Sequence, residues 1–137
     1  LGALAERLGM TSRTHFLGSL DTAAMVAFYQ GLNAFVLPSR SRPNWVEQFG
    51  RVLIEAMACN VPVLGSRSGE IANVIGDAGA LFPEGDISAL SDALRTLLGS
   101  PDAARAIGQR GRERAVAHFS MRRIALDTVR VYREMRN

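Results

Sequence analysis

Short apolar runs alternate with longer amphipathic runs along roughly the first 85 residues of the chain. The short runs are apolar on both faces, which is typical of parallel strands covered by helices. They predict strands at Thr14–Leu17, Ala34–Leu37, Val61–Leu64 and Gly79–Phe82. Strands that alternate with helices indicate βαβ units, so the pattern predicts an α/β fold with a Rossmann-like, doubly wound parallel sheet.

The longer runs between these strands have helical spacing. They predict helices at Asp21–Tyr29 and Gly50–Cys59 and a single helical turn at Ile71–Ile75. Asp21 or Thr22 is expected to cap the first of these helices, because short polar side chains accept hydrogen bonds from the free N–H groups at a helix start.

The pattern becomes entirely helical after residue 86. Helices are expected at Ile87–Leu98, from Pro101 to about Ala117, and at Met121–Met135, the last capped by Ser120. The last helix has arginines on one face and an apolar stripe on the other, which indicates packing. The stripe contains Ile124, Val131 and Met135. Three helices exceed what one sheet face needs, so at least one is expected to pack elsewhere.

The length of 137 residues suits one domain. We expect a single, incomplete domain, with the sheet portion at about residues 1–85 and a helical tail at 86–137. The chain starts without Met, and Leu1–Arg7 has the pattern of a helix end rather than a signal peptide, so we expect it to be cut from something longer. No apolar run approaches the roughly 18 residues of a membrane span.

All 16 basic residues are arginine, and the net charge is +3. A coding bias is favoured over phosphate recognition as the explanation, and the lack of lysine excludes Schiff-base and P-loop lysine chemistry. The single cysteine, Cys59, excludes an internal disulfide and favours a reducing, cytoplasmic compartment. His15 and His118 are interpreted as structural, and no cluster has metal-ligand spacing.

Two glutamates eight residues apart, Glu47 and Glu55, frame the start of the helix predicted from Gly50. Glu47 lies in the preceding loop, where its side chain can turn over the helix N-terminus. The backbone of Phe49–Val52 then presents unpaired N–H groups, which attract anions and above all phosphate. A carboxylate accepts hydrogen bonds from sugar hydroxyls. Phosphate donors beside hydroxyl acceptors predict a nucleotide-sugar site.

Glu55 interrupts an apolar run, so its carboxylate lies either on a narrow solvated stripe or beside a buried partner. On spacing alone, a surface ion pair with Arg51 explains it about as well as a ligand does. The ligand interpretation gains support because Glu55 lies two turns from the phosphate end, about where the ribose of a bound diphosphate would lie.

Other loop residues are weaker candidates. The Ser66–Gly69 loop follows a predicted strand, where doubly wound sheets bind ligands, and it is either a pocket wall or a plain turn. Arg40 and Arg42 flank the pocket loop, and solvation is favoured over phosphate contact for both. Trp45 either caps a ligand or packs on the protein.

The order and spacing of these motifs resemble those of the retaining GT-B glycosyltransferases of family four, the group-one glycosyltransferases. The resemblance covers nearly the whole chain. The matching segments are Phe16-Leu17-Gly18, Tyr29, Pro38-Ser39, Glu47-Gln48-Phe49-Gly50, Glu55-Ala56-Met57-Ala58-Cys59, Val61-Pro62-Val63, Gly69 and Gly76-Asp77-Ala78-Gly79. The E-x7-E spacing is weak alone, and the flanking Pro-Ser and Ala-Met-Ala make it strong.

The resemblance implies the latter part of a C-terminal, nucleotide-sugar-binding domain of a hexosyltransferase. Glu47 would be the catalytic residue, bonding hydroxyls of the donor sugar, and Glu55 would bind the ribose. The implied donor-binding residues are Phe49, Gly50, Arg51, Val52, Glu55, Ser68 and Gly69. Transfer would keep the anomeric configuration, and neither a metal nor another cofactor is expected.

The resemblance also implies parts upstream of Leu1: an acceptor domain and the cations that balance the diphosphate. The chain alone is therefore expected to be inactive. The acceptor is left open between a lipid, a saccharide and a small molecule, and peripheral contact with the inner membrane face is an expectation. The alternative is a non-catalytic or differently catalytic relative on this fold, such as an epimerase, a phosphorylase or a nucleotide-binding module.

Some positions depart from the family pattern. Asn60 stands where the family usually has glycine, and asparagine tolerates left-handed backbone, so the turn is expected to survive. Asn73 stands near a frequent glutamate, although Glu70 is close by. Acidic residues interrupt the Arg-rich tail, which argues against nucleic acid as a partner. An anionic membrane suits the tail better, and a solvated helix surface is favoured over both.

Overall fold

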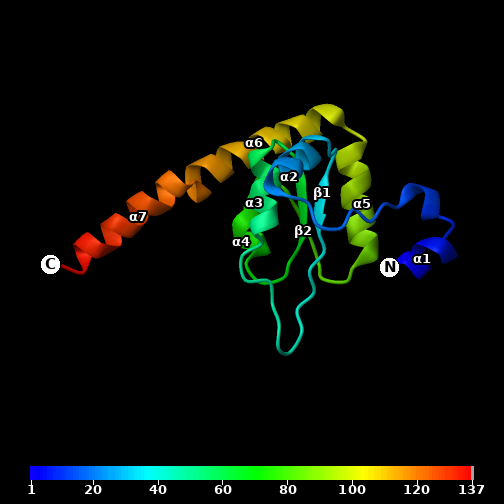
Figure 1. Cartoon of the computed structure of the whole chain (residues 1–137), viewed down its shortest axis with the longest axis horizontal. Coiled ribbons are helices and arrows are strands. Elements are labelled where there is room, and N and C mark those ends of the chain that lie inside the picture. Colours follow the sequence, from blue (N-terminus) through cyan, green and yellow to red (C-terminus); the bar gives the residue numbers. More distant parts are fainter. Residues whose placement is uncertain (137) are drawn as a thin grey trace.

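The computed structural model describes residues 1–136. Helices and strands alternate from residue 22 to residue 82, and the elements before and after that stretch are helical (Figure 1). The elements are α1 (Gly2–Arg7), a short 3-10 helix (Thr11–Arg13), α2 (Thr22–Gln30), β1 (Phe35–Leu37), α3 (Arg51–Ala58), β2 (Val63–Ser66), α4 (Ile71–Ile75), β3 (Ala80–Phe82), α5 (Ile87–Leu98), α6 (Pro101–Phe119) and α7 (Met121–Glu134).

The three strands form one parallel sheet in the order β1-β2-β3. Phe35 pairs with Val63, and Leu64 pairs with Ala80. Every residue of the central strand β2 is buried, because α3 and α4 lie on one side of the sheet and α5 lies on the other (Figure 1). The predicted α/β class with a parallel sheet is confirmed.

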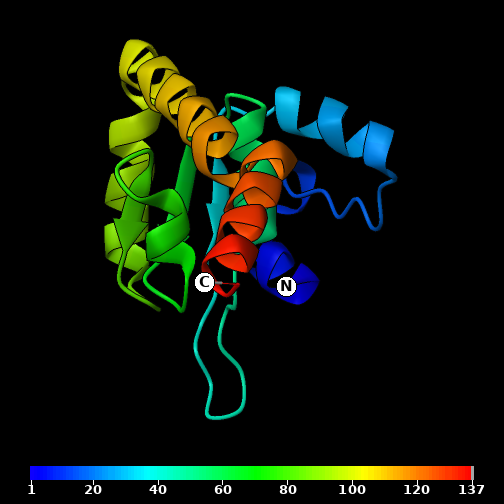
Figure 2. The ribbon, with the colours of Figure 1, turned by 90° about the vertical axis from the view of Figure 1, so that its left-hand side faces the viewer.

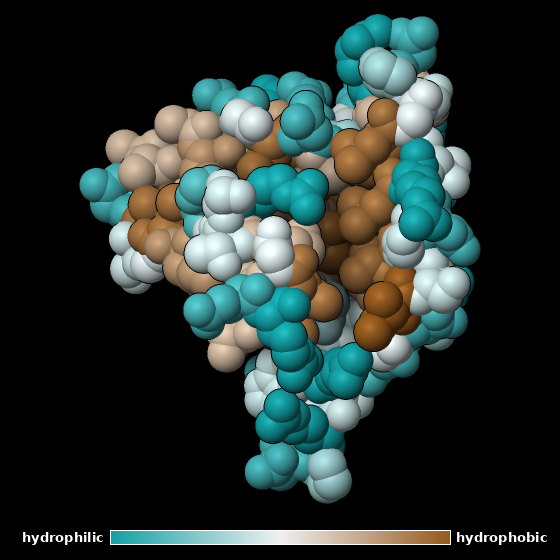
Figure 3. All heavy atoms as spheres, turned by 90° about the vertical axis from the view of Figure 1, so that its right-hand side faces the viewer, coloured by the Kyte–Doolittle hydropathy of each residue, from teal (hydrophilic) through white to brown (hydrophobic). Residues whose placement is uncertain are grey.

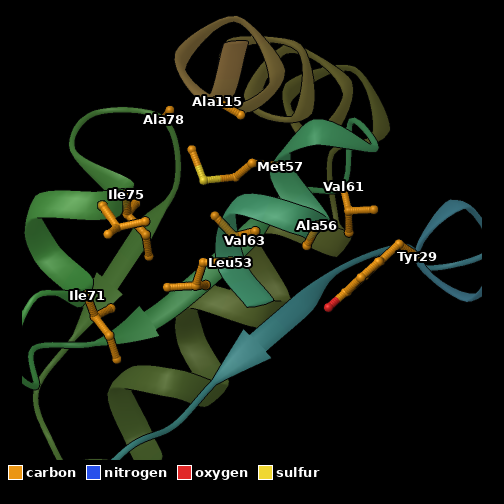
Figure 4. Packing of buried hydrophobic residues seen from close by; sticks show 11 residues of the cluster. Tyr29, Leu53, Ala56, Met57, Val61, Val63, Ile71, Ile75, Ala78 and Ala115 are labelled. Atoms are coloured by element: carbon orange, nitrogen blue, oxygen red, sulfur yellow. The ribbon is translucent and has the colours of Figure 1, made fainter. Parts of the chain in front are cut away.

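The larger of two hydrophobic clusters lies between the sheet and the helices α3, α4 and α6. Leu53 and Met57 of α3 pack there with Ile75 of α4, and all three are fully buried (Figure 4). Successive side chains of β2 point to opposite faces of the sheet. Val63 therefore packs in this cluster, and Leu64 packs in the smaller cluster beside α5. This packing fixes where α3 begins, and the candidate site lies at that point.

The strand predicted at Thr14–Leu17 is wrong. That segment has no regular secondary structure, and Phe16 and Leu17 are 66% and 57% exposed. A strand needs a neighbour to pair its backbone groups. None of the three strands within residues 1–136 pairs with this segment.

The central strand begins at Val63 instead of Val61. Pro62 has no N–H to donate to the ladder, although its carbonyl accepts a hydrogen bond from the first residue of β1 at 2.9 Å. The strand also continues through Gly65 and Ser66, which the sequence pattern assigned to the following loop. The central strand therefore reaches closer to the candidate site than predicted.

The helical tail divides into two parts. α5 packs on β3 and α6 packs along α3, so both belong to the body of the fold. Ser120 caps α7 as predicted, its Oγ accepting the N–H of Arg123 at 3.3 Å, but no residue of α7 is buried. The apolar stripe predicted to pack contacts no core within residues 1–136, and the helix leads away from the body (Figure 1). The expected single, incomplete domain remains a prediction.

The side of the molecule that carries α1 and α5 is hollowed, and apolar atoms gather in the hollow (Figure 3). In the described part of the chain, no helix combines the length and the apolar character needed to cross a membrane.

Candidate functional site

A long loop joins the end of β1 to the start of α3 and projects from the body of the fold (Figures 1 and 2). Glu47 lies on its returning side. Glu47 Oε1 accepts the N–H of Gly50 at 3.1 Å, and Oε2 accepts the hydroxyl of Ser39 at 3.3 Å. Gly50 makes this turn with a φ of 69°, a left-handed conformation that glycine adopts without strain. The Glu47 side chain thus folds over the start of the helix.

The start of α3 holds free hydrogen-bond donors. Within residues 1–136, the backbone N–H groups of Phe49, Arg51 and Val52 make no hydrogen bond to the protein. The prediction of four free N–H groups is wrong for Gly50, because Glu47 itself accepts that donor. Three donors remain at the positive end of the helix dipole, where an anion is stabilised.

Glu55 is half-buried and holds two partners. Its Oε2 accepts the hydroxyl of Tyr29 at 3.1 Å, and its Oε1 pairs with Nε of Arg51 at 3.0 Å. The ion pair between Arg51 and Glu55, which the sequence analysis weighed against a ligand contact, is therefore present. The Arg51 side chain is 85% exposed. The sequence analysis did not predict the Tyr29 contact, because it named Tyr29 only as a position that matches the family and assigned it no partner. Burial, and then the hydrogen bond with Glu55, raises the pKa of Tyr29 to about 12.

A cavity of about 330 Å³ opens beside Glu55, between α2 and α3. Apolar side chains of Leu20, Met25 and Val26 line it together with the Glu55 carboxylate and Arg51. An apolar wall beside a hydroxyl acceptor can enclose a planar ring and bind a sugar attached to it.

The loop after β2 lies beneath the loop that carries Glu47. Ser68 is completely buried, and its hydroxyl lies 3.0 Å from that of Ser41. Gly69 has a φ of 50°, and a Cβ at that position would lie 1.9 Å from the carbonyl oxygen of Glu47. The N–H of Glu70 donates to the same oxygen at 3.1 Å. This loop therefore supports the Glu47 backbone, and the Ser68 hydroxyl faces Ser41 instead of an open pocket.

Sequence reasoning missed Glu84. Its Oε2 accepts the N–H of Ser41 at 2.8 Å, and its Oε1 accepts the Ser41 hydroxyl at 2.6 Å. These two bonds hold the pKa of Glu84 below its usual value. The available signal was its position, because Glu84 follows β3 and the loops after parallel strands meet at one edge of the sheet.

The projecting end of the long loop carries Trp45. Its backbone bridges to Arg42 in an antiparallel turn, with N–O distances of 2.7 and 3.1 Å. The Trp45 side chain is 49% exposed, so it does not pack in the core. It lines cavities of about 480 and 600 Å³, the first with Arg40 and the second with Glu47.

Two departures from the family pattern have a local explanation. Asn60 has a φ of 62°, so asparagine keeps the left-handed turn as expected. The Asn73 amide donates to the Glu70 carboxylate at 2.8 Å. His118 is exposed and lies beside Phe119, with 6.2 Å between ring centroids, and its structural role remains a prediction. Among the described residues, no group of three His, Cys, Asp or Glu side chains could hold a metal ion.

The fold defines a class of protein, the GT-B glycosyltransferases. Sucrose-phosphate synthase from Thermosynechococcus elongatus is 35% identical and superposes with a TM-score of 0.84, over 97% of this chain and 33% of its own. HepE of Anabaena, in a structure that holds UDP and glucose, superposes with a TM-score of 0.85 over 96% of this chain and 35% of its own. At 22% identity, HepE shows the fold alone.

The chain belongs to the family "Glycosyl transferases group 1", whose sequence profile matches residues 1–114. The MMP alpha-(1->4)-mannosyltransferase of Mycolicibacterium hassiacum is 33% identical over 132 residues, which is 94% of this chain and 31% of that relative. The chain spans about a third of the length of the curated relatives it matches. The predicted membership of the group-one glycosyltransferases is confirmed, whereas retention of configuration, the C-terminal position in the enzyme and the roles of individual residues remain predictions.

Proposed function

We propose that this chain is the donor-binding part of a glycosyltransferase that moves a hexosyl group from a nucleotide diphosphate sugar to an acceptor, with retention of configuration. One observation carries the proposal: free N–H groups at the start of α3 lie between the carboxylates of Glu47 and Glu55. An anion site flanked by two hydroxyl acceptors fits a sugar, a diphosphate and a ribose in that order.

The nucleoside lies on the Glu55 side of the diphosphate in this proposal. Glu55 is four residues beyond Arg51, a rise of about 6 Å along α3, which suits the step from a diphosphate to its ribose. Each Glu55 oxygen has one protein partner and keeps a lone pair for a ribose hydroxyl. The base then enters the apolar cavity between α2 and α3.

The sugar lies on the Glu47 side, and Glu47 orients it through its hydroxyls. The bond between the anomeric carbon and the diphosphate oxygen breaks, and its electron pair leaves with the diphosphate. The acceptor hydroxyl bonds to the same face of that carbon and passes its proton to the departing diphosphate oxygen. Charge grows on the departing diphosphate, where the fixed N–H donors of Phe49, Arg51 and Val52 stabilise it without reorganising. We propose that these amides and the upstream cations, not a metal ion, stabilise the departing diphosphate.

Further parts of the enzyme lie outside this chain in the proposal. A domain upstream of Leu1 supplies the acceptor site and the cations for the diphosphate, so residues 1–137 alone bind donor without turnover. The acceptor is a lipid, a saccharide or a small molecule. The exposed apolar stripe of α7, with arginines between residues 122 and 136, supports a cytoplasmic enzyme in peripheral contact with an anionic membrane face.

A thermal-shift panel of UDP-, GDP- and ADP-sugars on the intact protein tests the proposal. We expect one nucleotide class to raise the unfolding midpoint by several degrees, because a ligand that binds only the folded state stabilises it. Glu55→Ala should remove this rise. Glu113→Ala, at an exposed carboxylate on α6, should keep it. If no nucleotide sugar shifts the midpoint, or if Glu55→Ala keeps the full shift, the donor assignment fails.

A further inference from the structure

Glu84 holds Ser41 with both of its carboxylate oxygens. One oxygen accepts the Ser41 N–H at 2.8 Å and the other accepts the Ser41 hydroxyl at 2.6 Å. The two residues are 43 positions apart in sequence. A two-point contact of this kind fixes the orientation of the Ser41 backbone as well as its position.

Ser68 completes this contact from beneath. Its hydroxyl lies 3.0 Å from the Ser41 hydroxyl, and its side chain is fully buried. Either hydroxyl can donate in that bond, and a side-chain hydrogen bond from Ser68 also lowers the pKa of Glu84. A displacement of Ser41 would therefore break its bonds to Glu84 and to the buried Ser68 hydroxyl together, so the three residues form one network.

Ser41 lies two residues beyond Ser39, which contacts the Glu47 carboxylate. Ser39 donates its hydroxyl to Glu47 Oε2 at 3.3 Å, and its carbonyl accepts the Ser66 hydroxyl at 2.6 Å. The outgoing side of the loop is therefore held at residues 39 and 41 before it reaches the exposed turn at Arg42–Trp45. The returning side is held at the Glu47 carbonyl by the loop after β2.

We propose that Glu84 is a positioning residue: through Ser41 and Ser39 it sets the orientation of the Glu47 carboxylate over the start of α3. This inference rests on the proposed function for the role given to Glu47. Glu84 itself touches no reacting atom in this arrangement. Its contribution appears as the correct placement of the transferred sugar, while the diphosphate binds the free N–H groups at the start of α3 and the nucleoside binds further along the helix.

Hydrogen exchange at single amides tests the positioning directly, on the intact protein without ligand. The Ser41 amide reports the Glu84 contact, and the Gly50 amide, which donates to Glu47 Oε1, reports the Glu47 carboxylate. Glu84→Ala should speed exchange at both amides by about three- to tenfold. Glu84→Gln, which keeps one acceptor for Ser41, should have a smaller effect at both. Glu113→Ala should change neither amide.

Turnover of the nucleotide sugar identified by the panel is the second measurement. Glu84→Ala should lower kcat about tenfold and change the KM of the donor less than twofold, and Glu84→Gln should recover most of kcat. Faster exchange at Ser41 with unchanged exchange at Gly50 would show that Glu84 anchors only the outgoing side of the loop, at Ser41, and the proposal would fail. If the intact protein uses no nucleotide sugar, the proposed function fails, and the Gly50 amide still decides the positioning.

Discussion

The two ends of the candidate site are held in different ways. Glu47 is fixed by backbone groups and short hydroxyls, namely the N–H of Gly50, the hydroxyl of Ser39 and the loop beneath it. Glu55 is fixed by two long side chains, Tyr29 from α2 and Arg51 from its own helix. The position of Glu47 therefore depends on how two loops fit together, whereas that of Glu55 depends on individual side-chain contacts. Substitutions should affect the two ends to very different degrees.

The largest effect is expected at the Glu47 end from Gly69→Ala. The new Cβ would collide with the carbonyl oxygen of Glu47, 1.9 Å away, and alanine would have to adopt a left-handed conformation. We expect a loss of about 3 kcal/mol or more of unfolding free energy, measured by urea denaturation. The loop that carries Glu47 should lose its protection from hydrogen exchange.

Gly18→Ala is the matched control for Gly69→Ala. Gly18 has a similar φ of 67°, and nothing lies within 4 Å of a Cβ placed there. Only the conformational cost applies, about 1–2 kcal/mol. Equal losses for the two variants would show that the contact between Gly69 and Glu47 does not hold the loop.

A smaller effect is expected at the Glu55 end from Tyr29→Phe. The substitution removes one hydrogen bond to a half-buried carboxylate and leaves the ring in the core, so we expect a loss of about 1 kcal/mol at neutral pH. Denaturation of the two proteins side by side measures it. A loss as large as that of Gly69→Ala would contradict the difference between the two ends.

The pH dependence of the same pair gives a second measurement. The pKa of Tyr29 is raised to about 12 in the folded protein, above its ordinary value of 10.0. The stabilisation it provides is therefore complete below pH 10 and is lost as the pH rises through about 12. Across that interval the unfolding free energy of the unmodified protein should fall more steeply with pH than that of Tyr29→Phe. Parallel profiles for the two proteins would contradict the raised pKa.

The smallest effect is expected from Arg51→Gln. The ion pair of Arg51 with Glu55 is solvent-exposed on the arginine side, so its loss should cost about 0.3 kcal/mol and should vanish in high salt. Arg110→Gln is the control, because Arg110 is exposed and makes no ion pair among the described residues. A salt-independent loss would mean that Arg51 acts through something other than this pair.

Sequence patterns predicted the parts of the fold that depend on local chemistry. Asp21 caps α2, its carboxylate accepting the N–H of Ala24 at 2.8 Å, and Pro101 opens α6. The parallel strands were visible because they are apolar on both faces. The exposed segment at Phe16 and Leu17 is also apolar, but it has no partner strand within residues 1–136. Composition therefore cannot distinguish a paired strand from an unpaired segment.

The candidate site was predictable where neighbours in sequence make it and unpredictable where distant loops meet. The turn of Glu47 over the helix start follows from Gly50, three residues later. The contact of Glu84 with Ser41 joins loops 43 positions apart, and the Tyr29 contact with Glu55 spans 26. The first pair depends on how β1, β2 and β3 lie side by side, and the second depends on how α2 packs on α3, neither of which a local pattern contains.

Calorimetric titration with two ligands, a nucleoside diphosphate and the same diphosphate carrying its hexose, tests most directly whether Glu47 and Glu55 hold opposite ends of one donor. On the intact protein, Glu55→Gln should weaken both ligands to the same degree, by about tenfold, because both contain the ribose. Glu47→Gln should weaken the sugar-bearing ligand about tenfold and leave the plain diphosphate unchanged. If the two substitutions weaken both ligands alike, or if Glu47→Gln weakens the plain diphosphate, the division between a sugar end and a ribose end is contradicted.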